Sequence, residues 1–213
     1  MKHLIIVGAG GFGREIYCSA TESIGFEEEF DIKGFLDPDA HKLDGFEGYP
    51  PILGVEDTYK IEPNDVFICA FGDALLKMKV CNTVLSRGGE FINLIHKEAF
   101  ISKNVIIGKG NIISKGCFIS CDTRIGDFNT FNDFVSIGHD TVIGNNNAFM
   151  TATRVSGIVT IGDSNFFGVN SCMVQGVRVG HNITLAAGSA LIRRTRDGYT
   201  YIGVPASPLI IKK

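Results

Sequence analysis

The sequence lacks the features that would assign it to a membrane or nucleic-acid-binding class. It has no tryptophan and only 6 prolines among 213 residues, and 20 basic against 23 acidic residues leave a net charge of −3. No apolar run approaches the roughly 18 residues of a membrane-spanning helix. The slight acidity provides no electrostatic footprint for nucleic acid. We therefore expect a cytoplasmic protein with neither a membrane nor a nucleic-acid partner.

The six cysteines form no CxxC pair, and most of them fall in segments expected to be strands or helices. Reduced, buried thiols of a cytosolic protein are the simplest interpretation. Cys117 and Cys121 could be imagined as metal ligands, but no histidine pair stands at zinc spacing. We therefore expect no metal.

The second half of the chain has a strict six-residue period. Sixteen apolar residues each stand six positions after the last: Ile101, Ile107, Ile113, Ile119, Ile125, Phe131, Ile137, Ile143, Phe149, Val155, Ile161, Phe167, Met173, Val179, Leu185 and Leu191. A period of six fits neither an α-helix nor a flat strand. It is typical of the hexapeptide β-solenoid, in which the chain turns a corner every six residues. Three hexads make one triangular coil, so residues 18 apart should stack.

Two further patterns follow from this register. Asn111, Asn129, Asn147 and Asn165 are 18 apart, which predicts a ladder of stacked amides along one corner. Four positions after most hexad residues stands a small or β-branched residue suited to an inner corner. Phe118, Phe134 and Phe166 are expected on the flat faces of the solenoid, where they would pack against other subunits.

The first half alternates strands and helices. An apolar strand over residues 3–7 precedes Gly8-Ala9-Gly10-Gly11-Phe12-Gly13, a G-x-G-x-x-G turn that opens a helix at Arg14. We read this segment as a strand because it ends in a glycine turn, where a signal peptide would have a cleavage site. Further strands are expected at 30–36, 66–70 and 91–95, and a helix at 74–85. The alternation predicts a small parallel sheet.

Ligands of parallel sheets bind beyond the carboxyl ends of the strands. The glycines of the turn let backbone N–H groups approach a diphosphate at a helix N-terminus. Asp37 ends the second strand, near the place where an acidic residue would meet a ribose or base. With four strands the second half of a dinucleotide fold is missing, so a nucleotide sugar fits better than a dinucleotide. The alternative is an α/β domain whose glycines serve only the turn.

Two histidines, His139 and His181, each stand two residues after a hexad residue. They are 42 residues apart, or seven hexads, so they lie on different edges of the solenoid. Asp140 follows His139, and a carboxylate beside an imidazole fixes its tautomer and makes it more basic. His139 is therefore the better candidate for a general base. The alternative is an ordinary surface histidine.

Seven segments together resemble one family: GAGGFGREI, FLD, AFGD, NLIH, SIGHDTVIG, RVSGIVTIG and YIGVPASP. The family is the bacterial sugar acetyltransferases that join a small nucleotide-sugar-binding domain to a left-handed β-helix. It includes nucleotide 4-amino-sugar N-acetyltransferases and relatives called sialic acid O-acetyltransferases. The resemblance covers essentially the whole chain.

The resemblance implies an α/β Rossmann-like domain over 1–96, a left-handed parallel β-helix of hexapeptide repeats over 97–192, and a C-terminal cap over 193–213. It implies a homotrimer with acetyl-CoA in the groove between adjacent solenoids, His139 as general base and Asp140 as the group that tunes it. The implied cofactor contacts are Ala148, Gly157, Val169 and Ala187. The implied nucleotide-sugar contacts are Gly10, Gly11, Phe12, Asp37, Pro38 and Gly72.

Two positions depart from the family. Some relatives have histidine where this chain has Phe12 and Ala148, which weakens the transfer of substrate identity but not of the reaction. The basic residues Arg193, Arg194, Arg196, Lys212 and Lys213 near the C-terminus either attract the coenzyme phosphates or form a solvated cap.

We expect acetyl transfer from acetyl-CoA to the amine of a nucleotide-linked sugar, of the 4-amino-4,6-dideoxy kind. Three other functions stay open. They are O-acetylation of a sugar such as sialic acid, a non-catalytic nucleotide-sugar-binding trimer, and a nicotinamide oxidoreductase.

Overall fold

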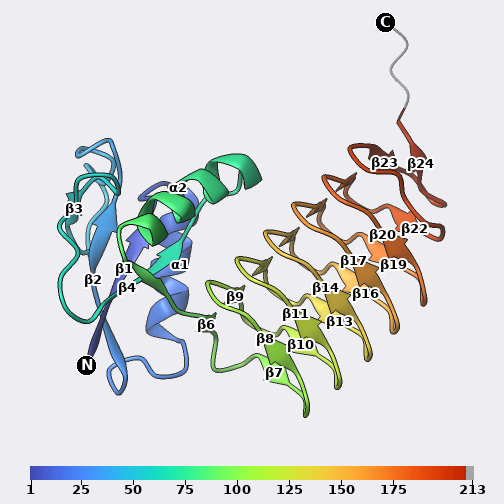
Figure 1. Ribbon diagram of the computed structural model, residues 1–213, viewed down its shortest axis with the longest axis horizontal. Helices are drawn as coiled ribbons and strands as arrows, with labels where there is room; N and C mark the ends of the chain where they lie inside the picture. The colour runs from blue at the N-terminus through green and yellow to red at the C-terminus, as the bar shows by residue number, and fades with distance from the viewer. Residues whose placement is uncertain (210–213) are drawn as a thin grey trace, which may run out of the picture. The chain divides into compact units, whose positions relative to one another are not determined.

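The computed structural model describes residues 1–209, which form two compact units. The first covers Met1–Lys97 and the second begins at Glu98 (Figure 1). Lys212 and Lys213, two of the basic residues singled out in the sequence, lie outside the described residues.

The first unit is a five-stranded parallel sheet with the strand order β3-β2-β1-β4-β5. The strands are β1 (Lys2–Val7), β2 (Phe30–Leu36), β3 (Ile52–Gly54), β4 (Asp65–Cys69) and β5 (Glu90–Phe91). Two helices, α1 (Gly11–Thr21) and α2 (Ala74–Ser86), follow β1 and β4. The central strand β1 is fully buried over Leu4–Val7, as its continuous apolar run predicts for a parallel strand covered on both faces.

Three details of this unit differ from the sequence prediction. The edge strand β3 was missed, because three residues after two prolines give almost no periodic signal. The segment predicted as one strand over 91–95 is two short strands, β5 and β6 (Leu94–Ile95). Helix α1 begins at Gly11 rather than Arg14, so the last glycines of the turn form its first turn.

The solenoid consists of sixteen two-residue strands, and each ends on one of the sixteen predicted apolar residues. They are β7 (Phe100–Ile101), β8 (Ile106–Ile107), β9 (Ile112–Ile113), β10 (Phe118–Ile119), β11 (Arg124–Ile125), β12 (Thr130–Phe131), β13 (Ser136–Ile137), β14 (Val142–Ile143), β15 (Ala148–Phe149), β16 (Arg154–Val155), β17 (Thr160–Ile161), β18 (Phe166–Phe167), β19 (Cys172–Met173), β20 (Arg178–Val179), β21 (Thr184–Leu185) and β22 (Ala190–Leu191). The predicted fold class is confirmed.

The strands stack in three parallel sheets, one for each face of a triangular prism. The first face runs from β7 through β10, β13, β16 and β19 to β22, and the second from β8 through β11, β14 and β17 to β20. The third face contains β9, β12, β15, β18 and β21. Every pairing joins residues 18 apart, as Ile119 pairs with Ile137. Figure 1 shows the coils stacked without an interrupting loop.

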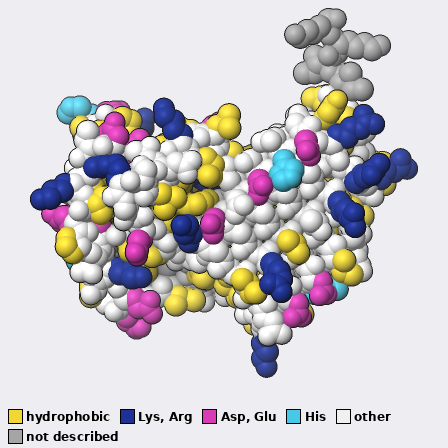
Figure 2. Space-filling view, in the orientation of Figure 1, with side chains coloured by type: hydrophobic (Ala, Val, Ile, Leu, Met, Phe, Trp, Pro, Cys, Tyr) yellow, Lys and Arg dark blue, Asp and Glu magenta, His cyan; other side chains and the backbone are white. Residues whose placement is uncertain are grey.

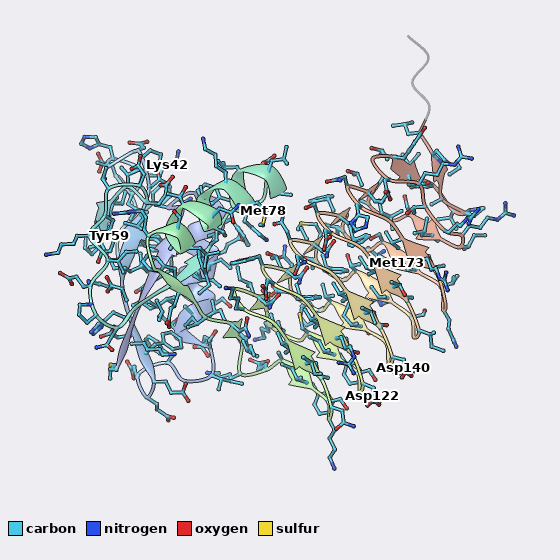
Figure 3. All side chains as sticks on the ribbon, viewed as in Figure 1. Lys42, Tyr59, Met78, Asp122, Asp140 and Met173 are labelled. Atoms are coloured by element: carbon cyan, nitrogen blue, oxygen red, sulfur yellow. The ribbon has the colours of Figure 1, made fainter. Side chains whose placement is uncertain are left out.

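The interior is filled by one side chain from each strand. The rings of Phe131, Phe149 and Phe167 stack on the third face with centroids 4.8 and 4.7 Å apart. Met173 projects into the same interior, as Figure 3 shows. This column of buried apolar groups is the hydrophobic core of the second unit.

Residues at the corners adopt a left-handed backbone conformation with φ near 60°, among them Asp122, Phe128 and Asp140. Phe134 is one of these corner residues, with φ 60° and 57 % exposure. The prediction that Phe134 stands on a flat face is therefore wrong, because it falls three residues after a strand. Phe118 and Phe166 do lie on faces, in β10 and β18, and are exposed.

The six-residue repeat ends after Leu191. A loop over 192–199 leads to β23 (Thr200–Ile202), which pairs Thr200 with Thr184 at an offset of 16 rather than 18 residues. β24 (Ser207–Pro208) then pairs antiparallel with β23. Among residues 1–209 no helix is long and apolar enough to cross a membrane.

Candidate active site

His139 and Asp140 follow β13, at the corner between the first and second faces. We call this corner, made by the residues two to four positions after each first-face strand, the His139 corner. Nδ1 of His139 lies 2.7 Å from Oδ2 of Asp140. Because a carboxylate only accepts hydrogen bonds, Nδ1 carries the proton and donates it. Nε2 is therefore left with a lone pair, which is the state that a general base requires.

Two glycines, which lack side chains, leave room for the imidazole of His139. A Cβ at Gly157 would lie 2.7 Å from Nε2 of His139, and a Cβ at Gly138 would lie 2.4 Å from the backbone nitrogen of Gly157. Both distances are shorter than real Cβ contacts. A side chain at Gly157 would therefore displace the imidazole, and a side chain at Gly138 would displace the backbone of Gly157. Gly138 was not singled out in the sequence, although its place directly after Ile137 is one that small residues share throughout the solenoid.

The backbone N–H groups of His139 and Gly157 have no acceptor among residues 1–209. Gly157 is buried, and a buried N–H without a partner is rare in native proteins. Gly157 thus borders the imidazole of His139. This corner therefore offers a proton acceptor and, in the adjacent coil, a backbone donor without an acceptor among residues 1–209.

The next corner, between the second and third faces, is built differently. We call it the ladder corner. Its inner positions hold the predicted ladder: Asn129 Nδ2 donates to Asn111 Oδ1 at 3.1 Å, and Asn147 and Asn165 continue the chain at 3.0 and 2.9 Å. All four amides are buried, so the register prediction is confirmed.

The outer positions of the ladder corner form a second ladder, which the sequence reading missed. Each backbone N–H donates to the side chain one coil further on. The acceptors are Asp127, Asn145, Asp163, His181 and Asp197. The first four acceptors are 18 residues apart in the sequence. The repeat is hard to recognise there because Asp, Asn and His alternate at these positions.

His181 belongs to this second ladder. The backbone N–H of Asp163 donates to its Nδ1 at 3.0 Å. Oδ2 of the same Asp163 lies 3.3 Å from Nδ1. The shorter contact, with a backbone nitrogen that only donates, assigns the acceptor role to Nδ1 of His181, whereas Nδ1 of His139 donates. His181 therefore acts as a structural acceptor. As predicted, the two histidines lie at different corners.

The four predicted cofactor contacts do not all come together in one chain. Gly157 lies against His139. Val169 and Ala187 stack at the third corner, where the N–H of Gly188 donates to the carbonyl of Val169 at 2.9 Å. Ala148 is half-buried on the third face, in β15. A single solenoid thus presents these residues at two corners and on one face.

In the first unit, the predicted glycine turn joins β1 to α1. Gly8 has φ +103°, and a Cβ at Gly13 would lie 1.9 Å from the carbonyl oxygen of Gly8, so both positions need glycine. Gly10 and Gly11 differ, because a Cβ there would meet nothing within 4 Å. The open space beside these two residues suits a ligand that approaches the backbone at the helix N-terminus.

Asp37 stabilises the backbone of this turn by hydrogen bonds. Its Oδ2 accepts a hydrogen bond from the N–H of Ala9 at 2.8 Å, and its Oδ1 accepts one from the N–H of Asp39 at 3.0 Å. Only 8 % of the residue is exposed. These bonds give Asp37 a positioning role in the turn, and because each oxygen can accept a second hydrogen bond, its contact with a ribose or base stays a prediction.

The other predicted substrate contacts lie around the same edge of the sheet. Pro38 and Gly72 are exposed after β2 and β4, and Phe12 is half-buried in the first turn of α1. Arg14, which the sequence reading passed over, places its guanidinium 3.7 Å above the ring of Phe46. This cation–π contact links the exposed segment after β2, which contains Phe46, to the first turns of α1.

All six cysteines are free thiols. Burial raises the pKa of Cys117 to about 12, so this thiol stays protonated and is a poor metal ligand. Cys121 precedes Asp122, which stacks one coil before Asp140 (Figure 3). No group of three metal-ligating side chains occurs within residues 1–209.

Two protein-family models match the chain. Residues 3–84 match the PglD N-terminal domain, and residues 158–193 match the hexapeptide repeat of succinyl-transferase. Among curated proteins, UDP-N-acetylbacillosamine N-acetyltransferase of Bacillus subtilis (strain 168) is 29 % identical over 117 residues, 53 % of this chain and 51 % of that protein. An uncharacterized protein L142 of Acanthamoeba polyphaga mimivirus is 31 % identical over 109 residues, 51 % of this chain and 20 % of its own length. The chain thus spans about half or less of these relatives.

Solved structures match over nearly their whole length. The acetyltransferase domain of PglB from Neisseria gonorrhoeae, in complex with acetyl coenzyme A, has a TM-score of 0.89 and 24 % identity, with 98 % of this chain and 99 % of that chain covered. PerB from Caulobacter crescentus, in complex with CoA and GDP-perosamine, has a TM-score of 0.86 and 25 % identity, with 98 % of each chain covered.

The solenoid and the repeat match give the chain the fold of hexapeptide-repeat acyltransferases, and the two neighbouring structures contain acetyl coenzyme A or CoA. With a match to the PglD N-terminal domain ahead of the solenoid, the chain is similar to sugar acetyltransferases such as the Bacillus subtilis protein.

Proposed function

We propose that the protein transfers the acetyl group of acetyl-CoA to the amine of a nucleotide-linked amino sugar, with His139 as the general base. The observation that carries this proposal is the geometry of the His139 corner. Asp140 accepts the Nδ1 hydrogen bond and so leaves Nε2 as the proton acceptor, and the ring packs against Gly157, whose N–H has no acceptor among residues 1–209. Acyl transfer to an amine needs these two groups together.

The reaction would proceed without a covalent enzyme intermediate. The sugar nitrogen attacks the thioester carbonyl, a C–N bond forms, and the carbonyl oxygen gains negative charge that the Gly157 N–H stabilises. Nε2 of His139 takes the proton from the nitrogen. The C–S bond then breaks, and the imidazolium returns the proton to the departing thiolate. Asp140 stabilises the imidazolium while it carries charge.

The first unit would hold the nucleotide part of the substrate. The open backbone at Gly10 and Gly11, at the N-terminus of α1, supports a diphosphate at this place. The relatives also support a nucleotide sugar. PerB was solved with GDP-perosamine, and the Bacillus protein is named for a UDP-linked sugar. We expect a 4-amino-4,6-dideoxy sugar.

A complete site would need more than one copy of the chain. The proposed cofactor contacts lie at two corners of the solenoid, and a groove between two copies would bring such corners together. We propose a homotrimer in which His139 and Gly157 of one copy face the third corner of the next, with Val169 and Ala187. Exposed apolar side chains, including the stacked pair Phe100 and Phe118, support such packing. Native mass spectrometry gives the copy number directly.

A thiol-release assay tests the reaction. Acetyl-CoA is incubated with the protein and with UDP-, dTDP- or GDP-linked 4-amino-6-deoxy sugars, and with free sialic acid in parallel. Turnover on one nucleotide amino sugar supports the proposal and names the substrate. Turnover on sialic acid alone would replace it by O-acetylation. Absence of acetyl-CoA binding in calorimetry would favour a non-catalytic trimer, and binding of NAD(P) an oxidoreductase.

A further inference from the structure

The first unit contains a buried pair of thiols beside a buried lysine. Cys69 ends β4 and Cys81 lies in α2, and only 3 % and 0 % of these residues are exposed. Lys77 stands one helical turn before Cys81 and is the only buried basic residue within residues 1–209. Figure 2 shows other basic side chains of this unit at its surface, where water solvates their charge. The proposed reaction uses none of these three buried groups.

The three side chains interact with one another. The two thiols form a hydrogen bond, and the ammonium of Lys77 lies close enough to act on both sulfur atoms. The hydrogen bond from Cys69 lowers the pKa of Cys81, and the charge of Lys77 lowers it further. The same hydrogen bond, together with burial, raises the pKa of Cys69. Cys81 is therefore the sulfur that becomes a thiolate, and Cys69 is the thiol that donates to it.

Cys117 shows that burial alone does not create this arrangement. It is as buried as the other two, but its sulfur donates to the backbone carbonyls of Phe131 and Asn132, at 3.6 and 3.1 Å, and not to a second thiol. Burial raises the pKa of Cys117 to about 12. The reactivity expected of Cys69 and Cys81 thus comes from the packing of α2 against the end of β4, and Cys117 provides an internal control.

Cys69 is also linked to the sheet edge that carries the predicted substrate contacts. The backbone N–H of Phe71 donates to the sulfur of Cys69. Gly8, in the glycine turn, faces this segment, because a Cβ there would lie 3.1 Å from the carbonyl oxygen of Ala70 and 3.4 Å from the ring of Phe71. A displacement of the Cys69 sulfur is therefore transmitted to the segment that packs against the glycine turn and leads to Gly72.

We propose that Cys69 and Cys81 form a redox-active pair, which a peroxide oxidises to a disulfide, and that this disulfide weakens nucleotide binding at the neighbouring turn. The Cys81 thiolate attacks the peroxide, the O–O bond breaks, and a sulfenic acid and hydroxide form. The Cys69 thiol then attacks the Cys81 sulfur, an S–S bond replaces the S–O bond, and water leaves. The hydroxide takes up the proton that Cys81 had released. In total, two thiols and one hydrogen peroxide give one disulfide and two waters.

The fold allows both the approach of the sulfur atoms and the entry of a small oxidant. The thiols are already in hydrogen-bond contact and must close to about 2.05 Å, which draws the end of β4 and α2 together. The first turn of α2 is exposed at Leu75 and Leu76, so local opening of this helix end loses little apolar contact and admits hydrogen peroxide. The effect on nucleotide binding rests on the proposed function, whereas the disulfide itself does not.

Peptide mapping by mass spectrometry on the full-length protein tests the disulfide. After brief treatment with hydrogen peroxide and alkylation of the remaining thiols, Cys69 and Cys81 should appear in one cross-linked pair of peptides that dithiothreitol separates. Cys117 should be recovered as a free thiol. Lys77→Met should slow the cross-link about tenfold, which corresponds to one unit in the pKa of the attacking thiol. Lys79→Met is the matched control, because Lys79 is exposed on the same helix, and its rate should not change.

Calorimetry measures the consequence for binding. UDP, dTDP and GDP are titrated into the reduced and the oxidised protein, with acetyl-CoA in parallel. For the diphosphate that binds the reduced protein, oxidation should raise the Kd about 5- to 150-fold, the usual range for coupled sites, and dithiothreitol should restore it. The Kd for acetyl-CoA should stay unchanged, because the coenzyme is proposed to bind the solenoid. In Cys81→Ala, peroxide should no longer change the Kd for the diphosphate.

Recovery of Cys69 and Cys81 as separate thiols, under conditions that oxidise the exposed Cys18, would overturn the proposal. A disulfide that leaves the Kd for the diphosphate unchanged would also overturn it, since the pair would then have no effect on the turn. The mapping needs neither substrate. A cross-link between Cys69 and Cys81 in a protein that binds none of the three diphosphates would disprove the proposed nucleotide site and leave the redox-active pair standing.

Discussion

The His139 corner and the ladder corner differ in how they use their backbone N–H groups. At the ladder corner, each outer N–H donates to an Asp, Asn or His side chain one coil further on. At the His139 corner, the equivalent positions hold Cys121, His139 and Gly157, which form no such ladder, and the N–H groups of His139 and Gly157 have no acceptor within residues 1–209.

The same repeating backbone thus uses its N–H groups for stabilising hydrogen bonds at the ladder corner. At the His139 corner, two of these groups remain available to a ligand. The two histidines occupy the same place in the hexad, but Nδ1 donates in His139 and accepts in His181. The difference comes from their neighbours. Nδ1 of His139 meets only the carboxylate of Asp140, at 2.7 Å, whereas Nδ1 of His181 meets the N–H of Asp163 at 3.0 Å and its carboxylate at 3.3 Å. Substitutions at His139, Gly157, Asp140 and His181, with comparison variants, test whether this division of roles is real.

The largest effect is expected at His139. His139→Ala should lower kcat by about 10²- to 10⁴-fold, because the proton acceptor is lost. The side chain is half-exposed, so the far-UV circular dichroism spectrum and the thermal midpoint should match the wild-type protein. Near-normal turnover in this variant would remove His139 from the mechanism.

The next effect is expected at Gly157. Gly157→Ala places a methyl group against Nε2 of His139, and should lower kcat about 10²- to 10³-fold by displacing the imidazole and covering the oxyanion donor. Gly162→Ala is the comparison variant, directly after β17 and next to the ladder corner, where the Cβ would meet the carbonyl oxygen of Gly180 at 2.6 Å.

The pair of glycine variants separates chemistry from stability. Gly162→Ala should destabilise the fold by about 1–3 kcal/mol, measured by chemical denaturation, with little effect on kcat in the remaining folded protein. Equal losses of stability in both variants, with no selective loss of turnover at Gly157, would contradict the comparison.

Asp140→Asn should have a moderate effect. The amide can still accept the Nδ1 hydrogen bond, but it no longer balances the charge of the imidazolium, so kcat should fall about 10- to 100-fold. Asp122→Asn, one coil earlier at the same corner, keeps a partner in Asn104 and should stay within about twofold of wild-type turnover. If both variants behaved alike, Asp140 would be only another corner residue.

The smallest effect is expected at His181. In His181→Asn, the amide oxygen can accept the Asp163 N–H, as Asn145 already does for Asp127, so stability should change by less than about 0.5 kcal/mol. His181→Ala removes the acceptor and should cost about 1 kcal/mol. Both variants should keep wild-type kcat. A large loss of turnover in His181→Asn would mean that the second histidine takes part in the reaction.

The sequence determined the solenoid and its register. A coil of fixed length allows one inward side chain every six residues, so the sixteen apolar residues and the Asn111 to Asn165 series specify which residues stack. The glycine turn and its place between β1 and α1 were equally readable, because Gly8 and Gly13 are required by the backbone of the turn itself. The missed strand β3 and the divided strand at 90–95 show the limit of such patterns in segments of two or three residues.

Only the tertiary structure decided the roles of individual polar groups. The direction of a hydrogen bond depends on which donor or acceptor another coil or strand brings into reach, and spacing along the chain does not state this. It is why Asp37 supports the backbone of the turn, why Nδ1 of His181 accepts while that of His139 donates, and why the Gly157 N–H has no acceptor within residues 1–209.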